Sequence, residues 1–183
     1  VVYKITGRHF ITANAAYLTR PPVPRTAYLS SRTRDAVIEG LTNEIAYSAD
    51  VSYVVRLARL KGRATFYMAQ INDQIWSRSF YHDDFRTLVN YTMTGVDQRH
   101  IGTEIGLEGN ITSTWVATAV FGGGRYLYDS RPTATITRDN SAEALSNRTV
   151  YWQNFRAGGV PQTAAPLGLR YNSPKSWFLG VHA

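Results

Sequence analysis

The chain has 183 residues, and its 20 Lys and Arg against 13 Asp and Glu leave a formal net charge of +7. Charged residues make up 18% and aromatic residues 13%, whereas an ordinary soluble domain carries about 25% charged residues. This content excludes intrinsic disorder, and the absence of Cys excludes a disulfide framework, a thiolate metal site and a Cys nucleophile. No apolar run approaches the roughly 18 residues of a membrane helix. The weak alternation of membrane β-barrel strands remains compatible with this composition.

The dominant pattern has a period of two, which predicts β-strands. Near the start of the chain, an apolar set alternates with a more polar one over residues 3–6 and 11–17. The apolar set is Tyr3, Ile5, Ile11, Ala13, Ala15 and Tyr17. Residues 45–57 show the clearest case, with Ile45, Tyr47, Ala49, Val51, Tyr53, Val55 and Leu57 on one face and Ala46, Ser48, Asp50, Ser52, Val54 and Arg56 on the other. One face of each strand is therefore apolar or aromatic.

The second half of the chain continues the pattern. Residues 63–76 and 114–128 are β-rich without a clear assignment of faces, and Gly122, Gly123 and Gly124 indicate a bend or a point of close packing. Branched aliphatic side chains at 101–107 alternate with polar positions that include Glu104 and Glu108. These two carboxylates share a face about 13 Å apart, too far for a glycosidase pair, and we interpret them as facing a barrel lumen. The last pattern covers residues 163–171, where Pro166 predicts a weak point.

Short and long connections alternate between these strands. Turn residues predict short connections at 7–8, 60–62, 108–110 and 172–176, and long loops at 18–44, 77–90 and 129–160. Regular alternation of this kind is typical of outer-membrane barrels, whose periplasmic turns are short and whose outer loops are long. Most of the positive charge is assigned to the long loops.

Aromatic residues gather near predicted strand ends, where an outer-membrane barrel has its two interfacial girdles. The alternative interpretation is the core of a soluble β-sandwich. The residues concerned are Tyr17, Trp76, Trp115, Tyr126, Tyr128, Tyr171 and Trp177.

No combination of residues predicts a catalytic, cofactor or metal site. The histidines His9, His82, His100 and His182 are scattered, without the spacing of metal ligands. The acidic segment 81–86 lacks the alternating oxygen ligands of a calcium loop, and we interpret it as a solvated loop tip. The many Arg residues form no dense run, so we expect no nucleic-acid binding. Ligand-binding residues remain unknown.

These observations predict an all-β protein: an antiparallel transmembrane β-barrel segment of about eight strands with alternating short turns and long loops. Residues 1–183 form a partial barrel domain in this interpretation, and we expect the chain to be a fragment, because it begins without Met and ends inside an apparent strand.

Four segments carry a resemblance to a known family. ITGRHFITANAAY (5–17), RATFYMAQINDQIW (63–76), YTMTGVDQRHIG (91–102) and LGLRYNSPKSWFLG (167–180) resemble the C-terminal part of the barrel of TonB-dependent receptors from Bacteroidetes-type bacteria. The resemblance implies a 22-stranded barrel in the outer membrane of a Gram-negative bacterium, plugged by an N-terminal domain, that takes up siderophores, glycans or peptides. The implied partners are outer-membrane lipid, the missing plug domain and final barrel strands, a surface lipoprotein and TonB.

Two other hypotheses remain open. The chain would also have the size of a complete eight-stranded outer-membrane barrel. The third hypothesis is a soluble basic β-sandwich that binds a polyanion. All three describe a protein that is not an enzyme.

Overall fold

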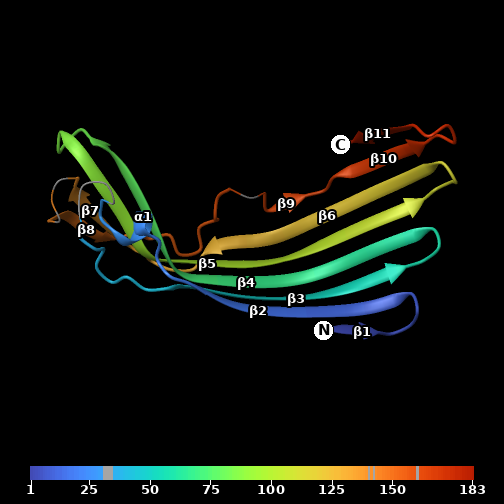
Figure 1. Ribbon diagram of the computed structural model, residues 1–183, viewed down its shortest axis with the longest axis horizontal. Coiled ribbons are helices and arrows are strands. Elements are labelled where there is room, and N and C mark those ends of the chain that lie inside the picture. Colours follow the sequence, from blue (N-terminus) through green and yellow to red (C-terminus); the bar gives the residue numbers. More distant parts are fainter. Residues whose placement is uncertain (31–34, 140, 142, 160) are drawn as a thin grey trace.

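The computed structural model describes residues 1–30, 35–139, 141, 143–159 and 161–183. Strands make up 66% of the chain and helix 2%, which confirms the all-β prediction. The strands found in these residues form one antiparallel sheet of eleven members (Figure 1). The expected number was about eight.

The elements in chain order are β1 (Val2–Lys4), β2 (His9–Arg20), α1 (Pro24–Ala27), β3 (Glu44–Arg56), β4 (Leu60–His82), β5 (Thr87–Asn110), β6 (Trp115–Tyr128), β7 (Thr133–Arg138), β8 (Ala144–Thr149), β9 (Thr163–Ala164), β10 (Leu167–Asn172) and β11 (Phe178–His182). Eight of the strands form a continuous path in the order β1-β2-β3-β4-β5-β6-β10-β11. Of the others, β7 pairs with β5 and β8, and β9 pairs with β6. No pairing joins β1 to β11 in the described residues, so the sheet is curved but open (Figure 1).

The register gives the sheet two distinct faces, because residues directly opposite in an antiparallel pair lie on the same side. Val51 of β3 is opposite Ala13 of β2 and Phe66 of β4, and we call this side the outer face. Its neighbour Ser52 is opposite Thr12 and Thr65, and we call that side the inner face. The faces predicted for residues 11–17, 45–56 and 101–108 agree with this register.

The four short turns are confirmed and lie together at one end of the sheet, which we call the turn end (Figure 1, right). They cover residues 5–8, 57–59, 111–114 and 173–177. The predicted turns at 60–62 and 108–110 were displaced by three residues, because the ladder between β4 and β5 continues through Leu60 opposite Gly109. The opposite end, with α1, β7 and β8, is the loop end.

Two of the three predicted long loops were wrong in part. Residues 77–90 are not a loop, because β4 and β5 continue for 23 and 24 residues and are joined through residues 83–86. The backbone hydrogen bonds of an antiparallel ladder need no apolar side chains. The polar residues of this segment therefore gave no sign in the sequence that β4 and β5 continue through it. The segment 129–160 contains the β7/β8 hairpin, which pairs with β5. The connection from β2 to β3 is long, as predicted.

Two irregularities bend the long β4/β5 hairpin. The register between the strands shifts twice, between Ile71 and Gln74 and between Gln74 and Trp76. Asp73 has a φ of 59°, and Gly95 on the opposite strand has a φ of 71°. Bulges of this kind increase twist and bend a strand, and beyond this point the hairpin turns away from the rest of the sheet (Figure 1).

The small hydrophobic core lies at the loop end, where the β7/β8 hairpin pairs with β5. Its buried members are Met93, Val96 and Ala134. The side chains packed around them are Trp76, Tyr91, Tyr128, Val150 and Trp152. Trp76 and Tyr128, which the sequence placed among girdle residues, are partly buried and pack against this core.

Glycines on the inner face make room for tyrosine rings. Tyr67 is opposite Gly102, and its hydroxyl is hydrogen-bonded to that of Tyr126 on β6, across β5. A Cβ at Gly102 would lie 2.7 Å from Cζ of Tyr67 and 2.9 Å from the carbonyl oxygen of Gly123. The close packing expected in the glycine triplet occurs at Gly124, where a Cβ would lie 3.0 Å from the Tyr126 ring. Pro166 does interrupt a strand, because it lies in the gap between β9 and β10.

We expect Gly102→Ala to destabilise the sheet by about 1–3 kcal/mol, the usual cost of overpacking, because the new Cβ displaces the Tyr67 ring and breaks its bond to Tyr126. Gly106→Ala is the matched control, since it lies on the same face of the same strand with no atom within 4 Å of a new Cβ. Thermal unfolding of both variants measures the difference. Equal stabilities would contradict this packing.

Candidate functional surfaces

The outer face exposes apolar side chains across seven neighbouring strands. Val51, Phe66 and Met68 are 51%, 56% and 51% exposed. Exposed apolar side chains on this face are Ile11, Tyr17, Tyr47, Val51, Tyr53, Phe66, Met68, Ile101, Ile105, Leu107, Phe121, Leu167, Leu169, Leu179 and Val181. Contiguous apolar surface on this scale marks an interaction site in a folded protein.

Charged side chains are rare on this outer face. In the regularly paired parts of β2 to β6, β10 and β11, it carries three charged side chains, Asp97, Arg99 and Arg125, all toward the loop end. Arg99 forms an ion pair with Asp129 at 3.3 Å. From Val51 to the turns, the outer face of these strands has no charge.

Aromatic residues border the outer apolar face at both ends. Tyr17 and Tyr47 stack at 6.2 Å toward the loop end. At the turn end, Tyr171 contacts Trp115 and Trp177, with ring centres 5.1 and 5.4 Å apart. Four of the seven residues predicted for girdles are therefore at these two borders, whereas Tyr126 lies on the inner face.

The inner face carries a hydrogen-bonded polar network. Asn14 donates to both carboxylate oxygens of Asp50 at 3.2 Å. Arg63 donates to Ser52 Oγ at 3.0 and 3.2 Å and to Thr65 Oγ1 at 3.2 Å, and these two hydroxyls are 2.9 Å apart. Ser52 is fully buried beneath this group. Sequence analysis missed Arg63 and Thr65 because the faces of residues 63–76 were not assigned.

The two glutamates lie on the inner face, as predicted. Glu104 is opposite Thr65 and Gly122, and Glu108 is opposite Lys61 and Thr118. Glu108 accepts a hydrogen bond from Lys61 at 3.1 Å. It therefore belongs to an ion pair between β4 and β5, and the two carboxylates do not meet.

The positive charge is not concentrated in the loops, contrary to expectation. We define the turn end by its four turns and the strand residues beside them, at 1–10, 54–63, 106–120 and 167–183. These ranges contain eight basic residues and one acidic residue, Glu108, so their net charge is +7. The other residues contain 12 of each sign. Arg residues in the long loops are numerous, but acidic residues nearly balance them.

Two adjoining cavities lie at the loop end, and both are lined by Arg25, Ser77 and Arg78. One has a volume of about 650 Å³ and is otherwise mainly apolar, with Trp76, Tyr91, Met93 and Trp152 among its lining residues. The second measures about 640 Å³ and is more polar. Trp152 contacts Trp76 at 5.6 Å and Tyr128 at 4.8 Å.

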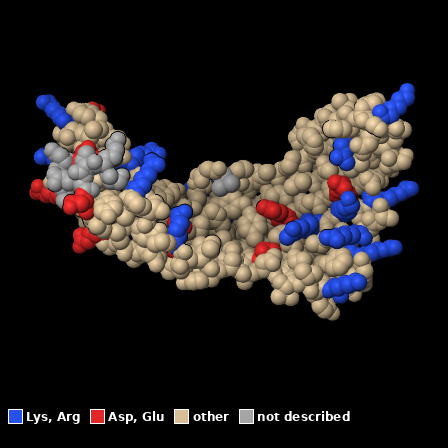
Figure 2. Space-filling view, viewed as in Figure 1, with Lys and Arg blue, Asp and Glu red and all other residues tan. Residues whose placement is uncertain are grey.

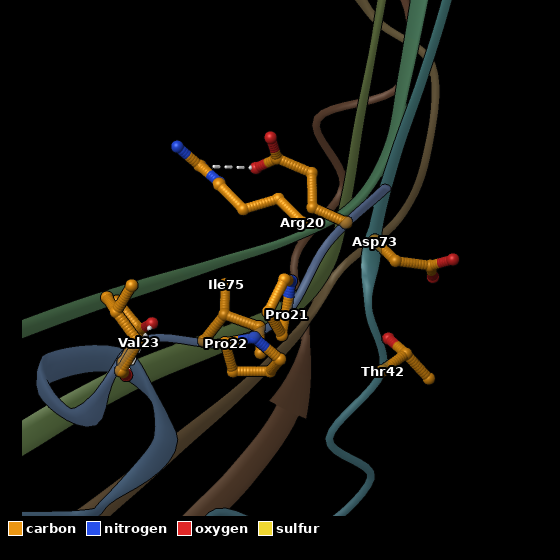
Figure 3. Close-up of a pocket in the computed structure, with 9 residues that line it drawn as sticks. Arg20, Pro21, Pro22, Val23, Thr42, Asp73 and Ile75 are labelled. Carbon is orange, nitrogen blue, oxygen red and sulfur yellow. Dashed lines mark hydrogen bonds and ion pairs between the residues drawn. The ribbon is translucent and has the colours of Figure 1, made fainter. Parts of the chain in front are cut away.

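A third, smaller cavity of about 110 Å³ lies where β2 ends (Figure 3). Figure 3 shows Pro21, Pro22 and Ile75 at its side. Arg20 above them donates to Glu44 at 2.7 Å, drawn as a dashed line. This ion pair joins the end of β2 to the start of β3.

The histidines remain apart and lie in three different settings. His9 Nδ1 is 2.6 Å from the Tyr53 hydroxyl, and His100 contacts Tyr126 with ring centres 5.0 Å apart. His82 lies 4.0 Å from Asp84 at the β4/β5 tip. The described residues contain no cluster of three or more potential metal ligands. Within the same part of the chain, no helix is long and apolar enough to cross a membrane.

Three carboxylates, those of Asp73, Asp97 and Asp129, lie near the bulge between β4 and β5. They lie beyond the exposed apolar side chains of the outer face. Asp97 Oδ1 accepts a hydrogen bond from the backbone N–H of Asp73 at 2.9 Å. Partial burial raises the pKa of Asp97, and the charges of Asp73 and Asp129 raise it further, while the Asp73 hydrogen bond opposes them. Ionisation of Asp97 is therefore less favourable in the folded sheet than in the unfolded chain.

We expect Asp97→Asn to raise the melting temperature at pH 7. A carboxyl whose pKa is raised by folding stabilises the fold below its unfolded pKa, and this contribution disappears as pH rises through the folded pKa. The amide retains an acceptor for the Asp73 N–H, so the advantage should shrink below about pH 4. Melting temperatures from pH 3 to 8 measure it, with exposed Asp35→Asn as control. A constant difference at every pH would contradict the assigned cause.

The fold and surfaces define an all-β protein with one two-faced antiparallel sheet. Comparison of the chain with protein-family models, with curated proteins and with solved structures finds no match.

Proposed function

We propose that this chain forms part of the wall of an outer-membrane β-barrel of the TonB-dependent receptor class. In this proposal the protein lies in the outer membrane of a Gram-negative bacterium and takes part in nutrient uptake, and it is not an enzyme. The observation that carries the proposal is the exposed, uncharged apolar band on one face of the sheet, with a polar network on the other face.

The chemistry of the outer face favours lipid over water. Side chains such as Val51, Phe66 and Met68 project outward and are half exposed, and exposure of apolar surface to water costs about 25 cal/mol per Å². Contact with acyl chains removes this cost over seven strands at once. Arg125 lies near one end of the band, where a long side chain can extend its guanidinium to the membrane interface.

The strand lengths agree with the thickness of a bilayer. β2, β3 and β6 have 12, 13 and 14 residues. At about 3.3 Å per residue they measure about 40–46 Å, which becomes about 28–33 Å for strands tilted by about 45°. The hydrocarbon core of a bilayer is about 30 Å thick. Aromatic contacts at both borders suit the two interfaces.

The free edges of the sheet would be completed by further strands of the same wall. β1 and β11 are the two ends of the strand path. Unpaired backbone groups are not tolerated in hydrocarbon, so both edges need partners in a membrane. The resemblance to TonB-dependent receptors adds a plug domain on the inner side, energy supplied through TonB, and a surface lipoprotein as a partner.

The loop end would then face outward, because long connections of such barrels lie outside the cell. It carries the hydrophobic core, the β7/β8 hairpin and the two large cavities. A rigid support of this kind would hold a nutrient-binding rim above the membrane.

The soluble β-sandwich is less favoured. A sandwich covers the apolar face of one sheet with a second sheet, whereas the described strands all belong to one sheet. A complete eight-stranded barrel requires its first and last strands to pair, and no such pairing occurs among the described residues.

We expect Val51→Arg to reduce membrane assembly strongly, because an Arg on the lipid face near mid-depth costs about 2–4 kcal/mol. Ser48→Arg is the matched control: it adds the same charge to an exposed position three residues away, on the inner face of the same strand. The folded fraction of the protein that carries this chain is measured in phosphatidylcholine vesicles by its resistance to SDS at room temperature.

Equal losses in both variants would refute the assignment of faces. A wild-type protein that stays folded and monomeric without detergent, and does not associate with the vesicles, would refute the membrane proposal itself.

A further inference from the structure

The +7 charge of the turn end is directed mainly to the inner face. Five of its eight cations lie on this face by register: Lys4 of β1, Arg56 of β3, Lys61 and Arg63 of β4, and Arg170 of β10. The hollowed side seen in Figure 2 has Lys and Arg side chains gathered at the turn end. Charge of one sign along a hollow attracts ions of the opposite sign.

Two of these guanidinium groups are held in place without a carboxylate partner among the described residues. Arg63 is oriented by the hydroxyls of Ser52 and Thr65. Arg56 lies over the Phe10 ring, with Cζ 5.5 Å from the ring centre. Because both groups are already positioned, a bound anion would cost less ordering of side chains.

These groups line a shallow, open hollow of about 420 Å³. Its lining includes Val54, Arg56, Lys61, Arg63, Gly106 and Val120. Lys61 is partly neutralised by Glu108 at 3.1 Å, while the two arginines keep donors available. The hollow therefore offers charge-assisted hydrogen bonds beside short apolar contacts.

The basic surface is too wide for one small anion to contact all of its cations. Lys4 and Arg170 are on strands six steps apart in the sheet, which corresponds to about 29 Å at about 4.8 Å per step. An extended peptide of about nine residues covers that distance at about 3.3 Å per residue.

The position of the aromatic side chains argues against a nucleic acid. Trp115 and Tyr171 at the turn end lie on the outer face, and Phe10 on the inner face has Arg56 over its ring. Single-stranded nucleic acids are bound by stacking bases on exposed aromatic rings. The inner face of the turn end instead presents cations separated by Val54, Gly106 and Val120.

We propose that the inner face at the turn end is a docking site for an acidic protein segment, held by Arg56 and Arg63 at the centre and by Lys4 and Arg170 at the sides. This site is argued from the inner face and its charge alone, and in a receptor of the proposed class the docked segment would share this face with the plug domain.

The test uses a fluorescent twelve-residue peptide of alternating Glu and Ser and the purified protein that carries this chain, in a zwitterionic detergent. We expect saturable binding by fluorescence anisotropy that weakens as salt is added, because exposed charges are screened. Arg56→Gln/Arg63→Gln should weaken binding about tenfold or more, a loss of about 1.4 kcal/mol per factor of ten. Arg25→Gln/Arg78→Gln, which removes the same charge from the loop end, should leave binding unchanged.

Two further arms make the result decisive. If the central variant does not fold, Lys4→Gln/Arg170→Gln removes two cations that form no side-chain hydrogen bond or ion pair in the described residues, and it should weaken binding in the same direction. The second arm measures binding of a seven-nucleotide oligothymidylate, whose six phosphates match the number of glutamates in the peptide. Tighter binding of the oligonucleotide, no binding of the peptide at low salt, or equal losses in the turn-end and loop-end variants would each overturn the proposal.

Discussion

The antiparallel ladder from β2 to β6 is the constraint on which the two surfaces depend. Its register keeps Val51, Ala13 and Phe66 on one side and Ser52, Thr12 and Thr65 on the other. A slip of one residue in any strand would move its apolar side chains to the polar face. The ladder therefore produces an uncharged band and a polar network from residues that alternate along every strand.

Glycine and bulged residues adapt this ladder to its two ends. Gly102 leaves space for the Tyr67 ring, which reaches Tyr126 across β5. Asp73 and Gly95 adopt left-handed backbone conformations where the β4/β5 hairpin bends. On the turn-end side of the bend, the sheet has one exposed apolar face. On the loop-end side, the β7/β8 hairpin and Trp152 enclose a small core. The sheet thus has two exposed faces on the turn-end side of the bend and carries a small packed core at the loop end.

The two proposals use opposite faces of the same wall. The apolar band would contact lipid, and the basic inner face at the turn end would hold an acidic protein segment. The docking proposal also depends on the four turns at the same end, which have cations on the strand residues next to them. Because the faces are separate, membrane association and peptide binding can fail independently.

The sequence alone determined the all-β class and the faces of the strands that alternate clearly, because alternation with a period of two acts through neighbouring residues. Residues 45–56 and 101–108 were assigned correctly from that pattern, and Pro166 marked the break between β9 and β10. Polar residues at 77–90 were mistaken for a loop, since their strands are stabilised by backbone pairing that side chains do not reveal. The alternation also identified the inner position of Glu104 and Glu108.

Only the tertiary structure decided which residues from different strands meet. Trp76 and Tyr128 pack against the small core, and Tyr126 is hydrogen-bonded to Tyr67 on the inner face. The net charge of +7 is located at the turn end and not in the loops, where the sequence had placed it. Strand pairing brings together cations that are distant along the chain, such as Lys4, Arg63 and Arg170. Local pattern determines the face of each side chain, whereas register and strand order determine its neighbours.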